Sequence, residues 1–295
     1  MNNHAVPCIF GEVLFDCFPD GNSVLGGAPF NVAWHLQAFG LSPLMISRVG
    51  DDELGEQVRA TMQDWNMDTS GLQLDAEHPT GTVDIEFDDG EPQYTIVEHR
   101  AYDYIDAGSL PSPGDDGLLY HGSLALRNQQ SRDALAELKQ YHHGSIFMDV
   151  NLRDPWWQED FVLKLASDAD WVKLNEDELA QLGNGIGDIG SQARQFIESH
   201  RLTGLVVTLG SKGAIILTDA GGFAEVIPSQ TLEVVDTVGA GDAFTSVLIL
   251  GLTNDWPLQQ TMQRAQEFAS LIVGKQGATV HDRGFYQKKI SDWGL

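Results

Sequence analysis

The stretch D-T-V-G-A-G-D-A-F, residues 236–244, sets two glycines and two aspartates between a strand-like run, residues 232–235, and a long helix-like apolar run. A strand followed by a glycine-rich turn and a helix start presents free backbone N–H groups to an anion. Gly239 and Gly241 permit close backbone approach, so a phosphate could lie against the N–H groups of residues 239–242. The helix dipole adds about half a positive charge at that end.

Asp242 stands at the start of this helix, beside the place where a phosphate would lie. A carboxylate there is electrostatically costly unless it has a task, and accepting the proton of a hydroxyl that attacks phosphorus is such a task. The simpler interpretation is a helix-start aspartate that the dipole favours. The stretch lacks the lysine of the G-x-x-x-x-G-K-[ST] loop and the third glycine of G-x-G-x-x-G.

Three more polar residues follow strand-like runs or precede a helix. Asp16 ends the first run and can accept two or more hydroxyl hydrogen bonds, as a polyol requires, or can be an ordinary turn residue before Pro19. Asn31 precedes V-A-W-H-L and is a strong N-cap candidate. Arg153 follows F-M-D-V, where parallel sheets place ligands, and can hold a phosphate or sugar oxygen or form a surface salt bridge.

The elements that must position these residues alternate along the chain. Strand-like runs include C-I-F-G-E-V-L-F-D, P-L-M-I-S-R-V-G, S-I-F-M-D-V, W-V-K-L-N, G-L-V-V-T-L-G and G-A-I-I-L-T. Helical patterns lie between most of them, such as N-V-A-W-H-L-Q-A-F-G, which Gly40 ends. This alternation predicts a mostly parallel sheet with helices on both faces.

Residues 80–99 break this rhythm. Val83, Ile85 and Phe87 alternate with polar residues, and D-D-G-E marks a tight turn before Tyr94. The pattern predicts a hairpin with one apolar face. Because an isolated hairpin is marginally stable, we expect a small sheet that recruits residues near 12–27 and projects as a lid or an interface.

The chain has 295 residues and a formal net charge of -26, from 17 basic and 43 acidic side chains. Such a chain repels nucleic acid and anionic membranes, although backbone N–H groups can still hold a small anion. Its two cysteines, Cys8 and Cys17, form no C-x-x-C pair and predict neither a zinc site nor a disulfide framework. The start resembles no signal peptide, and no apolar run is long enough for a transmembrane helix, so we expect a cytoplasmic protein.

Six motifs in order resemble those of the ribokinase-like, or PfkB, family of carbohydrate kinases, over nearly the whole chain. They are G-G-A-P-F-N at 26–31, V-G-D-D-E-L-G at 49–55, N-L-R at 151–153 after F-M-D-V, K-L-N-E-D-E at 173–178, V-T-L-G-S-K-G-A at 207–214 and the stretch at 236–244. The resemblance implies a three-layer α/β/α fold with a small β-sheet lid built from about 11–27 and 78–104, all within one domain of residues 1–295. It implies that ATP with Mg²⁺ phosphorylates a sugar hydroxyl.

The resemblance also implies a role for each site residue. Asp242 would be the general base, with Gly239, Ala240 and Gly241 around the transferred phosphoryl group. The sugar side would comprise Asp16, Gly26, Gly27, Asn31, Arg153 and, by a looser match, Arg100. The nucleotide side would comprise Lys173, Asn175, Thr208, Gly210, Lys212, Gly213 and Gln266, the last standing where several relatives carry Asn. Asn175 and Glu178 would orient Mg²⁺ through its waters, and Asp236 would help to hold K⁺ in a potassium-activated enzyme.

Two more of these roles, those of Glu178 and Lys212, also compete with simpler interpretations. N-E-D-E-L, which contains Glu178, also fits an acidic helix start, and Lys212 also fits a solvated turn lysine.

G-E-V-L-F-D, G-G-A-P-F-N and N-L-R are most similar to fructokinases, which implies fructose as the substrate. A 2-keto-3-deoxygluconate kinase is the alternative, because such enzymes share D-x-N-x-R. A ribokinase or nucleoside kinase fits less well, since the lysine of G-G-K-G-x-N is missing. A catalytically silent sugar sensor would be expected to lose Asp242 or the glycines, and a dinucleotide-dependent oxidoreductase would need G-x-G-x-x-G after the first strand. The apolar face of the lid could also form a homodimer interface.

Overall fold

The computed structural model describes residues 6–88, 91–111, 117–183, 185–228 and 236–295. The strand expected at residues 232–235 and the central residues of the turn in D-D-G-E lie outside these ranges.

The large sheet has nine strands in the order β13-β12-β11-β10-β9-β8-β1-β4-β5. Every pairing from β11 to β5 is parallel, whereas β12 and β13 are antiparallel additions at one edge. The strands are β1 (Cys8–Phe10), β4 (Leu44–Gly50), β5 (Leu72–Asp75), β8 (Leu119–His121), β9 (Ile146–Asp149), β10 (Trp171–Asn175), β11 (Gly204–Thr208), β12 (Ala214–Thr218) and β13 (Phe223–Val226).

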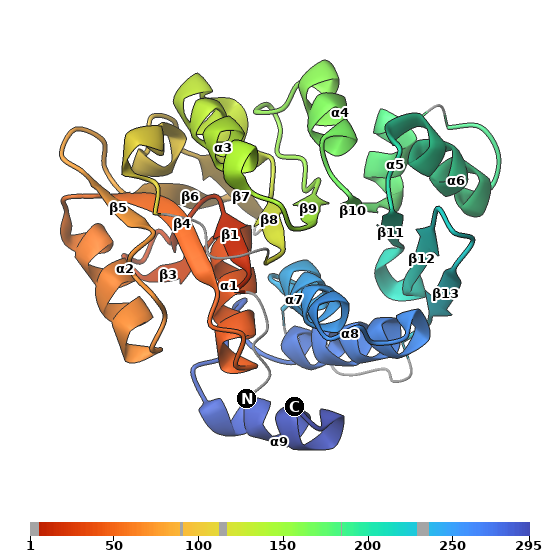
Figure 1. The fold of residues 1–295 in the computed structure, drawn as a ribbon. Coiled ribbons are helices and arrows are strands. Elements are labelled where there is room, and N and C mark those ends of the chain that lie inside the picture. Colours follow the sequence, from red (N-terminus) through yellow and green to blue (C-terminus); the bar gives the residue numbers. More distant parts are fainter. Residues whose placement is uncertain (1–5, 89–90, 112–116, 184, 229–235) are drawn as a thin grey trace.

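Helices cover both faces of this sheet, in two rows (Figure 1). One row contains α1 (Ala28–Ala38), α2 (Glu53–Asp64), α7 (Ala240–Thr253), α8 (Leu258–Val273) and α9 (Arg283–Trp293). The other contains α3 (Gln129–Tyr141), α4 (Glu159–Ser167), α5 (Glu176–Leu182) and α6 (Ile189–His200). The expected three-layer α/β/α fold is confirmed.

Alternate residues of one strand feed two separate cores. Ile9 of β1 belongs to the core shared with α1, α7 and α8, whereas Phe10 belongs to the core shared with α3, α4 and α6. Side chains of a strand alternate between faces, so a parallel strand covered on both sides must be apolar throughout. This is why the strands read as continuous apolar runs.

A second sheet of four strands has the order β3-β2-β6-β7. It comprises β2 (Leu14–Cys17), β3 (Ser23–Gly26), β6 (Gly81–Asp88) and β7 (Glu91–Ile96), and we call it the lid sheet. Leu14 and Val83 on its covered face pack against Tyr102, Leu124 and Ala125 of the body. The predicted hairpin and its recruitment of residues near 12–27 are thus confirmed.

The apolar face of the hairpin is not covered along its full length. Val83 and Ile85 are buried, whereas Phe87 is 57% exposed and Tyr94 is also 57% exposed. Phe87 lies at the end of β6, past the body residues that cover Val83, so the apolar face predicted for the hairpin is buried near the body and exposed at the tip.

The run C-I-F-G-E-V-L-F-D is two strands rather than the single strand expected. β1 belongs to the large sheet and β2 to the lid sheet, and residues 11–13 separate them. Gly11 has a φ of +154°, and a Cβ on it would collide with the ring of Pro29 in α1. The chain therefore passes from body to lid at Gly11, and Glu12 is buried at that junction.

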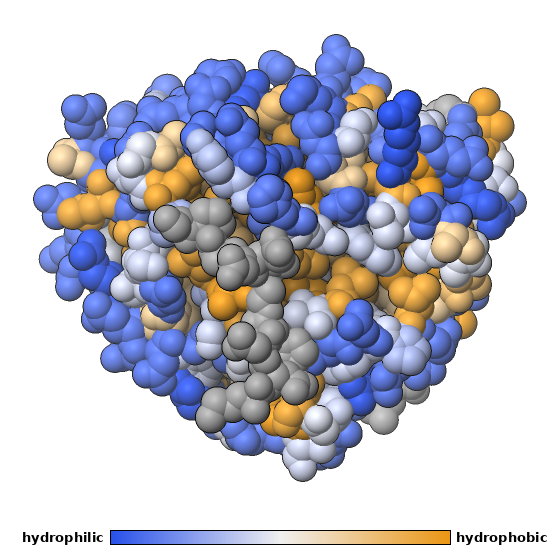
Figure 2. All heavy atoms as spheres, in the orientation of Figure 1, coloured by the Kyte–Doolittle hydropathy of each residue, from blue (hydrophilic) through white to orange (hydrophobic). Residues whose placement is uncertain are grey.

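The face of the molecule in Figure 2 is mainly hydrophilic, with apolar side chains gathered between the two rows of helices. None of the helices in the described ranges is long and apolar enough to cross a membrane. Cys8 and Cys17 are both free thiols.

The described residues also include short 3-10 helices, and some of these lie next to predicted site residues. They are η1 (Ala101–Tyr104), η2 (Ala107–Ser109), η3 (Leu124–Arg127) and η4 (Gly210–Lys212).

Candidate active site

The start of α7 presents an open set of backbone N–H groups. Gly239 is its N-cap, with a left-handed φ of 79°, and no side chain caps the helix. The Ala240 N–H makes one long bond of 3.4 Å to Thr237 O, and the N–H groups of Gly241 and Asp242 donate to nothing in the described parts of the chain. A side chain at Gly239 would collide with Ala278, so only glycine fits this turn. The geometry is that of an anion site.

Asn31 fixes the Asp242 carboxylate. Its Nδ2 donates to Asp242 Oδ2 at 2.7 Å, and this bond joins α1 to α7 across 211 residues of sequence. Burial raises the pKa of Asp242 to about 6, a rise that the Asn31 hydrogen bond opposes. A carboxylate with a pKa near neutrality is suited to accept a proton.

The interpretation of Asn31 as a helix N-cap is wrong. α1 begins three residues earlier, at Ala28, and its N-cap is Gly27. Pro29 accounts for the earlier start because it suits the first turn of a helix.

A buried ion pair lies beneath the glycines of α7. Lys173 Nζ donates to both oxygens of Asp149, at 2.9 and 2.8 Å. Thr245 Oγ1 of α7 lies 2.9 Å from Asp149 Oδ2 and 2.9 Å from Gly241 O. Burial alone would lower the pKa of Lys173, but Asp149 reverses the shift and keeps the ammonium charged. Lys173 thus supports the turn, and its predicted nucleotide contact would be through the field of its charge.

Asn175 and Glu178 form a reciprocal capping box at the start of α5. Asn175 Oδ1 accepts from the Glu178 N–H, and Glu178 Oε2 accepts from the Asn175 N–H, each at 2.8 Å. Glu178 Oε1 accepts from the Leu152 N–H at 2.8 Å. Burial raises the pKa of Glu178. With both carboxylate oxygens already bonded to backbone, the pair fits a contact to Mg²⁺ through water better than direct ligation.

Asp236 organises the loop that follows α8. Its Oδ1 accepts from the Val238 N–H at 2.9 Å and its Oδ2 accepts from the Gly277 N–H at 3.1 Å. Its carboxylate therefore ties the segment before α7 to the loop that contains Ala278. The described residues contain no cluster of three or more His, Cys, Asp or Glu side chains suited to a metal ion.

The predicted sugar residues meet at the junction between the lid sheet and the body. Gly27, with a φ of +107°, leaves only 2.8 Å between the position of a Cβ and the carbonyl oxygen of Glu12. Asp16 is half-buried on β2, and a Cβ on Gly26 would be 3.8 Å from Asn31 Oδ1. Burial raises the pKa of Asp16, and the positive charge of Arg153 opposes the rise. The charge of exposed Arg153 also opposes the rise in the pKa values of Glu12 and Asp242, so it acts on all three carboxylates.

Arg100 lies at the start of η1, where its backbone N–H donates to Asp103 Oδ2 at 3.0 Å. Its side-chain Nε is buried and has no partner in the described residues.

The nucleotide turn after β11 is more open. Thr208 ends β11, and Gly210 and Gly213 both have positive φ, of 58° and 102°, around η4. Lys212 is 70% exposed and lies 3.3 Å from Glu176, as a solvated turn lysine would. Gln266 of α8 donates to Ser270 Oγ at 3.2 Å within its own helix. The structure thus brings Asp242, Asn31, Gly241 and Lys173 together and leaves Lys212 and Gln266 with contacts elsewhere.

Sequence reasoning missed four buried polar residues: Asp149, Thr245, Glu12 and Arg127. Asp149 was visible as the first residue of D-x-N-x-R, and Glu12 as an acid inside an otherwise apolar strand-like run. Arg127 follows the strand L-Y-H closely in sequence, as Arg153 follows F-M-D-V. Thr245 has no signal of its own, because a threonine inside a helix gives no indication of a partner on another element.

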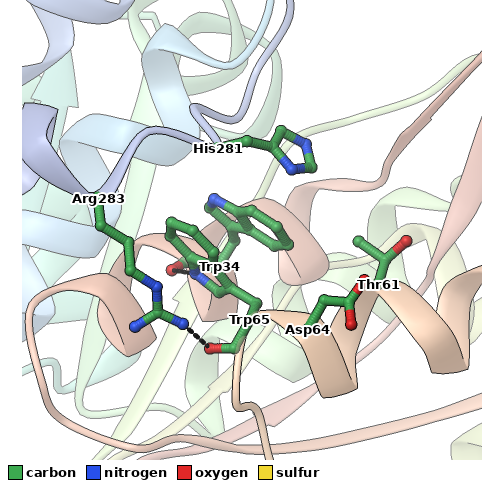
Figure 3. Close-up of a pocket in the computed structure, with 6 residues that line it drawn as sticks. All are labelled: Trp34, Thr61, Asp64, Trp65, His281 and Arg283. Atoms are coloured by element: carbon green, nitrogen blue, oxygen red, sulfur yellow. Dashed lines mark hydrogen bonds between the residues drawn. The ribbon is translucent and has the colours of Figure 1, made fainter.

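Two surface hollows lie away from this site. One of about 310 Å³ is lined by Trp34, Thr61, Asp64, Trp65, His281 and Arg283. Figure 3 shows the stacked tryptophans, with Arg283 bonded to the carbonyl of Trp65. The other, of about 240 Å³, is lined by Arg48, Ser70, Leu72, Gln73, Leu74, Asp106 and Ser109. Neither contains a predicted site residue.

A parallel α/β sheet with a lid sheet, an open helix start and a held carboxylate together suit phosphoryl transfer to a hydroxyl. The model of the pfkB family of carbohydrate kinases matches residues 18–282. The chain belongs to this family and is a sugar kinase.

Individual relatives agree with this assignment. The chain is 33% identical to a fructokinase of Klebsiella pneumoniae over 258 residues, which cover 83% of each protein. It is 29% identical to the aminoimidazole riboside kinase of Salmonella typhimurium, over 92% of this chain and 89% of that one. Among solved structures, the fructokinase of Vibrio cholerae O395 in a form with bound fructose, ADP and calcium ion has a TM-score of 0.79 and 30% identity, over 93% of this chain and 94% of that one.

Proposed function

We propose that this protein is an ATP-dependent fructokinase, which transfers the γ-phosphate of ATP to a hydroxyl of fructose. The observation that carries the proposal is the Asn31-held carboxylate of Asp242 beside the unbonded N–H groups at the start of α7. A base and an anion site in contact are what phosphoryl transfer to an alcohol requires.

In the proposed mechanism, Asp16, Gly26, Gly27 and Asn31 orient the sugar between lid sheet and body. Asp242 accepts the proton of the attacking sugar hydroxyl. As this happens, the hydroxyl oxygen bonds to the γ-phosphorus of ATP, and the bond between the γ-phosphorus and the β-phosphate oxygen breaks. The N–H groups of Gly241 and Asp242, with the α7 dipole, stabilise the charge on the transferred phosphoryl group. Arg153 and Arg100 supply positive charge on the sugar side.

The nucleotide would lie over η4 and α8, near Thr208, Gly210, Lys212, Gly213 and Gln266. Mg²⁺, when bound with ATP, neutralises the phosphate oxygens, and Asn175 and Glu178 would hold its waters. Lys173 would add its buried positive charge from below. Asp236 and the Gly277 loop that it fixes would hold K⁺.

Closure of the lid sheet over the sugar would exclude water and suppress hydrolysis of ATP.

The exposed apolar side chains of the lid sheet, Val24, Phe87 and Tyr94, would also serve a homodimer interface. Light scattering on the protein and on Phe87→Glu tests this: a dimer that becomes a monomer supports it, and a monomeric wild type contradicts it.

A coupled assay of ADP release tests the function with ATP, Mg²⁺ and K⁺. The acceptor panel holds fructose, 2-keto-3-deoxygluconate, ribose, tagatose, fructose 6-phosphate, adenosine and aminoimidazole riboside. We expect fructose to give the highest kcat/KM. Faster turnover of another acceptor would replace fructose as the substrate, and no turnover of any acceptor would overturn the proposed function.

A further inference from the structure

Buried polar atoms without partners gather beside Asp242, at the junction of lid and body. Within the described parts of the chain, these include Glu12 Oε2, Asn31 Oδ1, Tyr120 OH and Arg127 Nη1. Buried polar atoms are nearly always hydrogen-bonded, so such a group calls for a ligand or bound water. Asn31 already holds Asp242, which ties the group to the site.

Glu12 is the most deeply placed charge of this group, at 3% exposure. It lies in the segment between β1 and β2 that carries the chain from the body to the lid sheet. Burial raises the pKa of Glu12 to about 7; its own backbone N–H and the charges of Arg153 and Arg127 oppose the rise, and Asp242 adds to it. At pH 8 the side chain is therefore a buried carboxylate with a free acceptor oxygen.

Arg127 is held rigidly on the other side. Its Nε and Nη2 donate to the two oxygens of Asp103, at 2.6 and 2.8 Å, and Nη2 also reaches Tyr102 OH and Val97 O. Its guanidinium lies over the rings of Tyr102 and Trp156. The side chain is only 7% exposed, yet Nη1 has no partner in the described residues. One donor of a fully anchored arginine is thus left over.

Glu12 and Arg127 are near each other without touching. Tyr102 connects their surroundings: Arg127 Nη2 lies 3.0 Å from its hydroxyl, and a Cβ on Gly81 would lie 2.6 Å from Val13 O, next to Glu12, and 2.7 Å from the Tyr102 ring. No ion pair joins them, although each has a free, buried polar atom. An unpartnered acceptor on the acid and an unpartnered donor on the base suit a group that is both donor and acceptor, which is what a hydroxyl is.

We propose that Glu12 and Arg127 are sugar-contacting residues that bridge one neutral hydroxyl group, Arg127 Nη1 donating to it and Glu12 Oε2 accepting from it. This inference rests on the proposed function and names its substrate class: an uncharged polyol, with sugar acids rejected. A carboxylate in place of the hydroxyl would satisfy Arg127 but would face Glu12, and the carboxylates of Glu12, Asp16 and Asp242 outnumber the single charge of Arg153 that acts on all three. Fructose fits this arrangement and 2-keto-3-deoxygluconate does not.

The test is calorimetric binding of fructose and of 2-keto-3-deoxygluconate at pH 8, without nucleotide, to the wild type and Glu12→Gln. The amide keeps the size and removes the charge. We expect fructose to bind at least about tenfold more weakly, because a hydrogen bond to a charged group is lost. We expect 2-keto-3-deoxygluconate to bind at least about threefold more tightly, because the repulsion is removed. Opposite shifts for two ligands cannot arise from a loss of folded protein.

Glu198→Gln, an exposed acid on α6 at the other end of the sheet, is the control and should change neither affinity. Glu12→Asp is the second variant: it keeps the charge but withdraws it by one methylene, so fructose should bind more weakly while the acid stays rejected. Unchanged fructose affinity in Glu12→Gln, or a wild type that prefers the acid, would overturn the inference. Wild-type protein that binds fructose without phosphorylating it would overturn the proposed function alone.

Discussion

The buried polar groups beneath α7 and those at the junction of lid and body differ in how completely they are paired. Beneath α7, Lys173, Asp149 and Thr245 bond to one another. At the junction, Glu12, Arg127 and Asn31 each keep an atom that has no partner among the residues that the structure describes. Both regions contain buried charged side chains, so burial alone does not separate them.

The difference indicates which region is scaffold and which binds ligand. A complete network holds its own members in place and needs nothing more, so its loss should act on stability. An incomplete one carries an energetic cost in the unliganded protein that a ligand can relieve, so its loss should act on binding. Four predictions test this division, from the largest expected effect to the smallest.

Asp242→Asn should lower kcat by about 10²–10⁴, because the general base is removed while size and hydrogen-bonding capacity remain. ATP affinity should persist, since the N–H groups of α7 are unchanged. Steady-state kinetics and equilibrium binding measure the two quantities. Activity retained within tenfold would remove Asp242 as the base.

Lys173→Met should reduce the free energy of unfolding by about 3–5 kcal/mol, because it leaves the buried Asp149 carboxylate without its cation. Urea denaturation measures the change. Lys212→Met, which removes an exposed lysine from a surface pair, is the matched control and should leave the midpoint unchanged. Equal midpoints for both variants would mean that the network beneath α7 is not a scaffold.

Glu12→Gln should be more stable than the wild type at pH 8 by on the order of 2 kcal/mol. The folded-state pKa of Glu12 is raised from its ordinary 4.5 to about 7, so its contribution to stability is fully present below pH 4.5 and is lost as pH rises through 7. The advantage of the variant should therefore shrink toward pH 4. Urea denaturation from pH 4 to pH 8 measures the free energy of unfolding of the wild type, Glu12→Gln and the control Glu198→Gln. A difference between Glu12→Gln and the wild type that did not depend on pH would contradict this prediction.

Asn31→Ala should move the acid limb of kcat/KM for fructose upward from about pH 6 by up to about one unit. The Asn31 hydrogen bond lowers the pKa of Asp242, and the base must be ionised to act, so its loss delays activity as pH rises. Asn254→Ala, at the other end of α7, should leave the limb in place. If the acid limb of Asn31→Ala lies at the same pH as that of the wild type, Asn31 does not set the pKa of Asp242.

Much of the fold could be predicted because its signals are local. Strand-like runs at β4 and β9 to β12 and the helix near α1 follow from periodicity, and the hairpin follows from alternation and its turn. The division of β1 from β2 could not be predicted, since Gly11 breaks the run only through its approach to Pro29. The place of Asn31 inside α1 rather than at its cap did have a local signal, because Pro29 suits the first turn of a helix.

The amino-acid sequence by itself determined the chemistry available at residues 236–244, because glycine backbone freedom and an adjacent aspartate are properties of neighbouring residues. It also determined the family, through motifs whose order along the chain is visible in one dimension. Only the tertiary structure decided which charges share a field. Asn31 meets Asp242 because α1 packs against α7, Lys173 meets Asp149 because β10 pairs with β9, and Glu12 and Arg127 form no ion pair with each other. Pairing or its absence is a property of distance in space, and no local pattern encodes it.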